Sequence, residues 1–276
     1  MRILRVLALV ALLPTPLMAW GAKGHSVIAE VAERGLSPNV AVQIRQLNFA
    51  APLRDIASLP DDWRAQETRG ERPGDTGPLH YSNIPNDEAT FDRDRDCKEG
   101  RCIVGAVEKY AGILRDRTQS REARREALIY LVHFMGDLHQ PMHAAGGTIR
   151  NPETGQMEMD RGGNLVKVRY VGVETNLHSM WDSMLIEWGP STVDEYADHL
   201  MTIEMRGRPV EELQSGTVVD WFNESHHAAV HSAYDIGNGN LGGEYAQKNI
   251  GVVYERLLRG GLRLRKVLEE ALGGQN

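Results

Sequence analysis

The chain has 276 residues, of which 41% are hydrophobic and 25% are charged, and this composition is typical of a soluble globular protein. The formal charge is −7, and the loss of Arg2 and Arg5 with a leader would make it −9, because two positive charges are removed. This balance argues against a broad basic face for duplex nucleic acid, although bound divalent metal ions would change the local charge.

The first residues have the features of a secretory signal peptide. Two arginines precede an apolar run over residues 6–13, which is too short to span a bilayer, and two prolines end that run shortly before Ala19. A buried N-terminal helix is the alternative, but it gives the basic start and the proline stop no role. We expect a signal peptide over residues 1–19, a mature domain over residues 20–276, and a periplasmic or secreted location.

Most of the mature chain has the pattern of α-helices. Apolar residues recur at helical spacing after His25, between Pro38 and Leu47, and between Ile103 and Leu114. Ser120 can cap a strong helix over residues 121–137. Further helices are expected around Leu177, Asp194, Val219 and Glu244, and over residues 262–272.

Two segments break this helical pattern. Residues 164–170 alternate between apolar and polar side chains, which predicts a short strand or hairpin. Residues 146–163 are rich in glycine and predict a mobile loop close to the functional site. The sequence therefore predicts an all-α fold in a single compact multi-helix domain, with a small β-hairpin excursion.

The two cysteines, Cys97 and Cys102, enclose a short charged loop. In an exported protein they favour a disulfide over zinc ligation. A loop this short closes little chain entropy, so the bridge is interpreted as a local clamp.

The strongest signal in the chain is a repeated pair of metal-ligand residue types. His133 precedes Asp137 by four residues, and His178 precedes Asp182 by the same spacing, which on a helix places both side chains on one face. His143 follows directly after a helix-ending Gln-Pro pair. Imidazole and carboxylate are ligands of zinc, so two such pairs indicate metal chemistry.

Other segments offer further ligands, although each alone is explained by a cap, a loop or a surface charge. A chain that begins at Trp20 offers its free amine and carbonyl, with His25 nearby. Residues 60–64 offer a carboxylate, Asp61 or the adjacent Asp62, close to an arginine. His80 lies beside an aromatic residue. By contrast, His139 is interpreted as a residue of the core or as one that supports a metal ligand from behind. The row His227, His231 and Asp235 is a weak candidate for a further metal site.

Together these motifs resemble the secreted, zinc-dependent, single-strand-specific nucleases of fungi, plants and bacteria, which are relatives of zinc phospholipase C. The resemblance covers nearly the whole mature chain. It is carried by Trp20-Gly-x-x-Gly-His25, Pro60-Asp61-x-x-Arg64, Pro78-Leu-His80-Tyr81, His133-Phe-Met-Gly-Asp137-x-His-Gln-Pro-x-His143, Gly162-Gly-Asn164 and Leu177-His178-x-x-Trp181-Asp182.

The resemblance implies three zinc ions in one cleft. The first would be held by Asp61, His80, His133 and Asp137. The second would be held by His143, His178 and Asp182. The third would be held by the amino group and carbonyl of Trp20, by His25, and by Asp137, which would bridge two ions. The match to the family motif favours Asp61 over Asp62.

The resemblance also implies a mechanism. A metal-activated water would attack the phosphodiester, with Asp61 orienting it. Arg64 would meet phosphate oxygens in the transition state, or else form a surface salt bridge with the neighbouring carboxylates. Asn164 would donate a hydrogen bond to phosphate. Tyr81 would stack on a base and Asn83 would bind the edge of that base, which requires an unpaired base; a core position is the alternative for the tyrosine.

The expected function is an extracytoplasmic endonuclease that hydrolyses single-stranded RNA and DNA to 5′-phosphorylated products, with 3′-nucleotidase activity on nucleotides. We expect a monomer without a stable protein partner or membrane attachment. One alternative is a phospholipase C on the same scaffold, which would need an apolar interfacial surface. The other is a non-catalytic zinc-binding protein, which would have no need of Arg64, Tyr81 or a free amine at Trp20.

Overall fold

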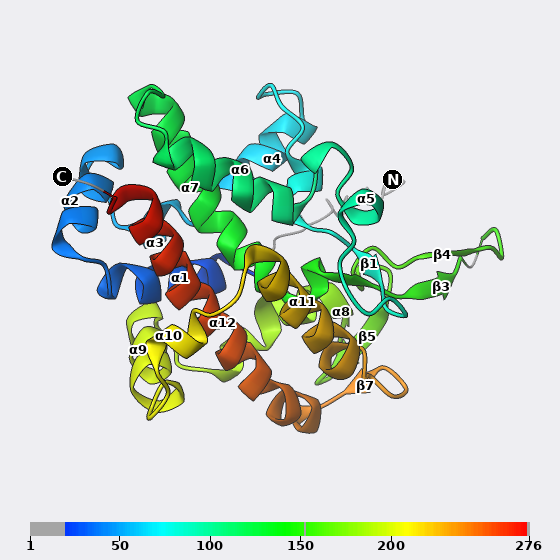
Figure 1. Cartoon of the computed structure of the whole chain (residues 1–276). Coiled ribbons are helices and arrows are strands. Elements are labelled where there is room, and N and C mark those ends of the chain that lie inside the picture. Colours follow the sequence, from blue (N-terminus) through cyan, green and yellow to red (C-terminus); the bar gives the residue numbers. More distant parts are fainter. Residues whose placement is uncertain (1–19, 152, 275–276) are drawn as a thin grey trace, which may run out of the picture.

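The computed structural model describes residues 20–151 and 153–274, so the expected signal peptide over residues 1–19 lies outside the described residues. The fold is mainly helical, as predicted (Figure 1). Its α-helices are α1 (Ala22–Arg34), α2 (Pro38–Leu47), α3 (Leu53–Ile56), α4 (Leu59–Thr68), α5 (Arg93–Asp96), α6 (Ile103–Arg115), α7 (Arg121–Leu138), α8 (Leu177–Ser179), α9 (Val193–His199), α10 (Val210–Leu213), α11 (Val218–Ala228) and α12 (Gly243–Leu272).

Helix α7 lies at the centre of the molecule and carries the first predicted ligand pair. It begins at Ser120, whose side chain accepts a hydrogen bond from the Ala123 amide at 3.1 Å, as expected of a serine N-cap. The helix ends just before Pro141, because a residue that precedes proline disfavours the helical conformation. Its second half is buried throughout, packed against α1, α4, α6 and α12.

Helices α1 and α12 cross closely beside α7. A β-carbon placed on Gly261 of α12 would lie 2.5 Å from the β-carbon of Val31 in α1, so only glycine allows this approach. The helices expected around Glu244 and over residues 262–272 are both present, as parts of one continuous helix of 30 residues. Figure 1 shows α12 running across the face of the bundle.

The β-structure is confined to short strands: β1 (Ile84–Pro85), β2 (Ala145–Gly146), β3 (Thr148–Arg150), β4 (Met157–Met159), β5 (Lys167–Tyr170), β6 (Val173–Asn176) and β7 (Asn240–Leu241). The expected hairpin is present as antiparallel β5 and β6, and β7 adds to β5 in parallel. The segment over residues 146–163, expected to be a mobile loop, contains β3 and β4, which pair as a second hairpin that projects from the bundle (Figure 1).

Two further features of the fold are a disulfide bond and the character of the helices. Cys97 and Cys102 form a disulfide, as predicted, between α5 and the start of α6. Among the described residues, no helix combines the length and apolar character needed to cross a membrane.

Candidate functional site

The candidate site is built around Asp137 and His133, one turn apart on α7. Both side chains are completely buried, and the Nε2 atom of His133 lies 3.1 Å from Oδ2 of Asp137. The other ring nitrogen of His133 donates to the carbonyl oxygen of Ala57 at 2.8 Å. A carbonyl partner on Nδ1 fixes the tautomer and leaves Nε2 for the carboxylate or for a metal ion.

Three other elements bring side chains to the same carboxylate. His80 ends the short helical turn η1 (Gly77–His80), and its Nδ1 atom lies 2.9 Å from Oδ2 of Asp137. His25 of α1 places Nε2 at 3.4 Å from the other carboxylate oxygen, Oδ1. Asp61 of α4 places Oδ1 at 3.8 Å from Nε2 of His133. Residues from α1, α4, η1 and α7 therefore form one cluster, which we call the Asp137 cluster: His25, Asp61, His80, His133 and Asp137.

The approach of His25 to α7 depends on Gly136. A β-carbon at this position would lie 2.5 Å from Nδ1 of His25. The imidazole of His25 stacks on that of His133 with ring centroids 4.1 Å apart, in the space that the glycine leaves. The sequence reasoning missed Gly136, because its role is visible only once α1 and α7 are packed together.

A second cluster lies beside the first and consists of His143, His178 and Asp182. His143 belongs to the turn η3 (Pro141–His143), His178 to α8, and Asp182 to the π-helical segment η4 (Met180–Met184). Nε2 of His178 lies 3.3 Å from Oδ2 of Asp182, and the two imidazole centroids are 5.0 Å apart. Nδ1 of His143 donates to the backbone carbonyl of His80 at 2.6 Å, and Nδ1 of His178 donates to that of Gly162 at the same distance.

The two clusters share a boundary and a supporting side chain. Nδ1 of His143 lies 3.7 Å from Oδ1 of Asp137, so the second cluster begins next to the first. The side-chain amide of Gln140 donates a hydrogen bond to Oδ1 of Asp182, and both residues are buried. The sequence reasoning treated Gln140 only as part of a helix end, and no sequence signal links it to a carboxylate 42 residues away.

The polar atoms of these clusters fit metal ions. Both ring nitrogens of His25, both carboxylate oxygens of Asp61, Nε2 of His80 and Oδ1 of Asp137 are buried without a hydrogen-bond partner. Burial of such groups without partners is costly, and native proteins avoid it unless an ion or a water satisfies them. Ligand atoms within 4.8 Å of one another form three groups: His25, Asp61 and His133; His80, His133 and Asp137; and His143, His178 and Asp182.

Burial sets the protonation states of the imidazoles. Desolvation lowers the pKa of His80 to about 4 and that of His178 to about 3, so both are neutral at pH 7, which is the form that binds metal. Burial opposes ionisation of Asp137, but His133 and His143 outweigh it and hold its pKa well below the usual value. In Asp182, burial dominates and raises the pKa well above the usual value, so a cation beside it would be needed to keep it ionised.

Trp20 lies next to the second cluster. It is the first described residue and is fully buried, and the amide of Gly21 donates to the backbone carbonyl of Asp182 at 2.7 Å.

The structure distinguishes Asp61 from Asp62, the two candidates for the aspartate of the family motif, by their burial. Asp61 is 4% exposed and belongs to the Asp137 cluster, whereas Asp62 points to solvent.

Of the predicted substrate residues, Arg64 contacts the Asp137 cluster directly. The Nη2 atom of Arg64 lies 3.1 Å from Oδ1 of Asp61, and its side chain is 20% exposed. Tyr81 follows His80 in extended backbone and is 42% exposed, so the alternative of a core aromatic was wrong. The side-chain oxygen of Asn83 is buried without a partner. Asn164 donates one amide hydrogen to the carbonyl of Arg161 at 2.8 Å.

The remaining histidines lie outside the clusters. His139 is buried, and its Nε2 atom lies 3.2 Å from Nη1 of Arg263, as expected of a core residue. His227 and His231 are exposed, with ring centroids 4.1 Å apart, and no third ligand residue joins them among the described residues.

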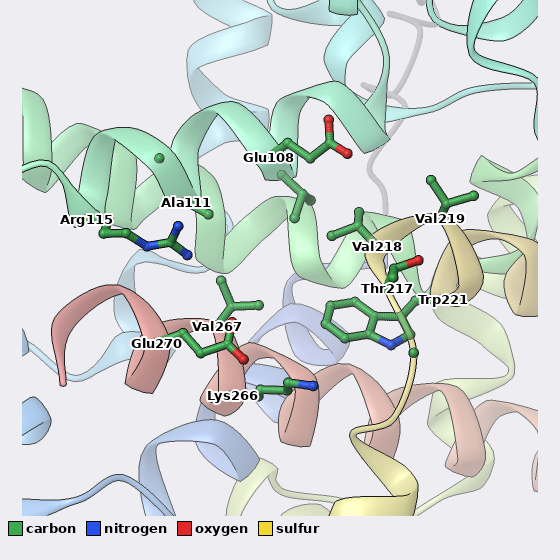
Figure 2. Close-up of a pocket in the computed structure, with 13 residues that line it drawn as sticks. Glu108, Ala111, Arg115, Thr217, Val218, Val219, Trp221, Lys266, Val267 and Glu270 are labelled. Atoms are coloured by element: carbon green, nitrogen blue, oxygen red, sulfur yellow. The ribbon is translucent and has the colours of Figure 1, made fainter. Parts of the chain in front are cut away.

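A separate cavity of about 450 Å³ lies between α6, α11 and α12, and none of the predicted site residues lines it. Figure 2 shows Glu108 and Arg115 of α6 facing Lys266 and Glu270 of α12 across this cavity, with Trp221 at its side. Charges of both signs alternate around the rim, so the cavity has no preference for an anionic ligand.

Comparison with known proteins agrees with this geometry. Endonuclease 2 of Arabidopsis thaliana is 30% identical, over 92% of this chain and 91% of its own length. Nuclease P1 of Penicillium citrinum is 25% identical, over 93% of this chain and 99% of its own. Nuclease S1 of Aspergillus oryzae is 25% identical, over 91% of each. The S1/P1 nuclease family matches residues 20–273, and the chain therefore belongs to this family of hydrolases of phosphodiester bonds.

Proposed function

We propose that this protein is an exported zinc-dependent endonuclease that hydrolyses single-stranded RNA and DNA to 5′-phosphorylated products, and that it also acts as a 3′-nucleotidase. The observation that carries the proposal is the Asp137 cluster, whose buried polar atoms lack partners, in a chain of the S1/P1 nuclease family. Membership of a nuclease family favours this function over phospholipase C. Residues 1–19 would be the signal peptide and residues 20–276 the nuclease domain, which would act as a monomer.

The donor set suits zinc, which binds imidazole nitrogen and carboxylate oxygen. Three ions would be held as follows: the first by Asp61, His80, His133 and Asp137, the second by His143, His178 and Asp182, and the third by the backbone of Trp20, His25 and Asp137. The two oxygens of Asp137 support its bridging role, because Oδ2 lies 2.9 Å from His80 while Oδ1 lies 3.4 Å from His25.

Bound zinc would supply positive charge at the scissile phosphate and would lower the pKa of a water molecule. The side chains of Asp61 and Arg64 would position the reacting groups. Asp61 is fixed between His133 and Arg64, at 3.8 Å and 3.1 Å, so its carboxylate is oriented from two sides. The partly exposed guanidinium of Arg64 has donors that can meet two phosphate oxygens at once, where negative charge develops.

The surrounding side chains account for the preference for single strands. The exposed ring of Tyr81 offers a stacking surface beside His80. The side-chain oxygen of Asn83 can accept a hydrogen bond from a base edge, because it has no partner in the protein. Asn164 retains a second amide hydrogen for phosphate. A base must leave its stack to use these groups, which costs a few kcal/mol in a duplex.

The test uses an exported sample whose N-terminus has been sequenced. We expect a start at Trp20, about three zinc ions per chain by elemental analysis, and chelator-sensitive cleavage of single-stranded DNA in preference to duplex. Bound zinc with no hydrolysis of any nucleic acid, on a chain that begins at Trp20, would contradict the proposal and direct attention to phospholipid substrates.

Adjacent aspartates provide a matched pair of variants. Asp61→Asn should remove a buried ligand, and we expect a loss of about 100-fold or more in kcat together with lower zinc content. Asp62→Asn changes an exposed carboxylate one residue away and should leave both unchanged. Equal effects of the two substitutions would exclude Asp61 as a zinc ligand.

A further inference from the structure

An exposed aromatic ring lies on a strained turn at the end of α2. Phe49 and Ala50 have φ values of 52° and 65°, a left-handed conformation that non-glycine residues rarely adopt in succession. Asn48 is buried and fixes the turn, with its side-chain amide donating to the Ala51 carbonyl at 2.9 Å. The side chain of Phe49 is 68% exposed. Strain of this kind persists where the surrounding structure enforces it, and it often marks a functional position.

Two arginines of α7 flank this ring. The guanidinium carbon of Arg121 lies 4.7 Å from the ring centroid of Phe49, and that of Arg125 lies 5.2 Å from it. These distances are typical of cation–π contacts. The chain therefore presents an aromatic face and two planar cations together, at the N-terminal part of α7 beside α2 (Figure 1).

A cavity of about 580 Å³ adjoins this ring and is lined by cations and amides. Arg117, Arg121 and Arg124 line it together with Asn39, Gln43, Gln46 and Leu47, and no carboxylate belongs to the lining. Each guanidinium group donates to one backbone carbonyl: Arg117 to that of Leu272, Arg121 to that of Gln46, and Arg124 to that of Leu114. In the described ranges, no salt bridge within 4.0 Å joins these three groups to a carboxylate, and Asp116 acts on Arg124 only at longer range. Most of their positive charge therefore remains available to an anion.

A smaller cavity of about 280 Å³ adjoins this surface and shares Phe49 and Arg121 with it. Three arginines outnumber two glutamates in its lining, which consists of Phe49, Trp63, Arg72, Arg121, Glu122, Arg125, Glu126 and Ile129. Trp63 directly precedes Arg64 in α4, and the guanidinium of Arg72 lies 4.4 Å from its ring. The nearby Glu126 pairs with Arg72 at 3.1 Å, so this arginine contributes a flat surface more than a free charge.

We propose that Phe49, Trp63, Arg117, Arg121, Arg124 and Arg125 form an accessory binding surface for a single strand of nucleic acid that extends from the cleft. Phosphates would contact the arginines, and one base would stack on Phe49. The proposal rests on the proposed function. The arginines give this surface a net positive charge, whereas the whole chain has a formal charge of −7.

The geometry gives a length for this strand. Arg121 and His133 are twelve residues apart on α7, which corresponds to ~18 Å along the helix. At a stacked spacing of 3.4 Å per nucleotide, this is roughly five nucleotides. A dinucleotide or a 3′-nucleotide occupies the cleft alone, whereas a strand of 15 nucleotides reaches the accessory surface.

The test measures binding of a fluorescent 15-nucleotide single strand by anisotropy. Every sample is zinc-loaded and carries Arg64→Gln as a common background, because this substitution should slow cleavage while the zinc ligands stay in place. The variant Arg117→Gln with Arg121→Gln should weaken binding about tenfold at low salt. It should also reduce the slope of log K against log salt concentration by about 1.4, because each phosphate contact on a single strand contributes roughly 0.7. Phe49→Leu should weaken binding about fivefold, and Phe49→Trp should restore it, because only an aromatic ring stacks on a base.

Controls separate this surface from the cleft and from general charge. Arg206→Gln removes an exposed arginine in a turn on another part of the molecule and should leave binding unchanged. In the otherwise unmodified enzyme, the same substitutions should raise KM for the 15-nucleotide strand and leave dinucleotide cleavage unchanged. Unaltered binding in the arginine and Phe49 variants, equal weakening by Arg206→Gln, or equal weakening for duplex DNA would overturn the proposal. An unmodified enzyme that cleaves no nucleic acid would instead contradict the proposed function.

Discussion

The Nη2 atom of Arg64 lies 3.1 Å from Oδ1 of Asp61, one turn earlier on α4. The pair joins a buried carboxylate to a guanidinium that reaches the surface. For Arg64→Gln we expect kcat on single-stranded DNA to fall by about 100-fold, because a cation that faces developing negative charge is lost. Zinc content should remain unchanged, since Arg64 donates no metal ligand. A parallel loss of zinc would show that the arginine acts by holding Asp61 and not by meeting phosphate.

Gln140 provides a test of indirect support for the second cluster. Its amide donates to Asp182, and burial raises the pKa of that carboxyl group well above the usual value. Gln140→Ala should weaken zinc affinity by about 10-fold to 100-fold, as is typical when the partner of a metal ligand is removed. The measurement is a competition titration with a chromophoric chelator. Gln214→Ala removes an amide that bonds to the Leu262 carbonyl, away from both clusters, and should leave zinc affinity unaltered.

Gly136 tests the close approach of α1 and α7. The β-carbon of Gly136→Ala would lie 2.5 Å from Nδ1 of His25, so the imidazole must move. We expect the loss of about one zinc per chain, although alanine favours a helix over glycine by about 1 kcal/mol.

Gly112→Ala is the matched control, because Gly112 lies in α6 with no atom near its missing side chain. This control should keep its zinc and gain up to about 1 kcal/mol in the free energy of unfolding. Full zinc content in Gly136→Ala would show that His25 binds no metal.

The pH dependence of stability should depend in part on Glu224. Burial opposes its ionisation, but Arg263 and Arg256, with contacts at 2.7 Å, lower its pKa to about 2. Because the folded-state pKa is depressed, the pair stabilises the fold fully above the unfolded-state pKa, near 4.5, and this contribution is lost as pH falls toward 2.

Denaturant unfolding of Glu224→Gln therefore should show a lower free energy of unfolding than the unmodified chain at pH 7, and a smaller difference at pH 3. Glu212→Gln, at an exposed position, should show little difference at either pH. A difference for Glu224→Gln that is equal at pH 7 and pH 3 would exclude its charge as the cause.

The sequence predicted those parts of the site that depend on local geometry. The spacing of His133 and Asp137 is four residues, and helical geometry alone brings their side chains together. The convergence of His25, Asp61 and His80 was expected only from a family resemblance, because these residues come from separate elements. No periodicity in the sequence indicates which of these elements pack together.

Two segments differ from the expectation for reasons that composition does not reveal. Helices were expected around Glu244 and over residues 262–272, and Gly260 and Gly261 between them each lower helix propensity by about 1 kcal/mol. In the structure their missing side chains allow α12 to cross α1 at Val31, and packing outweighs propensity. Residues 146–163 are rich in glycine, yet Thr148–Arg150 and Met157–Met159 pair as strands, because the hairpin bonds form across a turn that composition alone does not identify.

The burial of Trp20 also determines how the protein can be produced. Its side chain has no exposed surface, and the adjacent Gly21 is bonded to the backbone of Asp182. In a chain that begins at Trp20, as we propose, a purification tag fused directly ahead of this residue would remove the free amine and crowd the two side-chain clusters. Gly273 and Gly274, beyond the end of α12, are exposed. Recombinant versions should therefore carry their affinity tag at the carboxyl terminus.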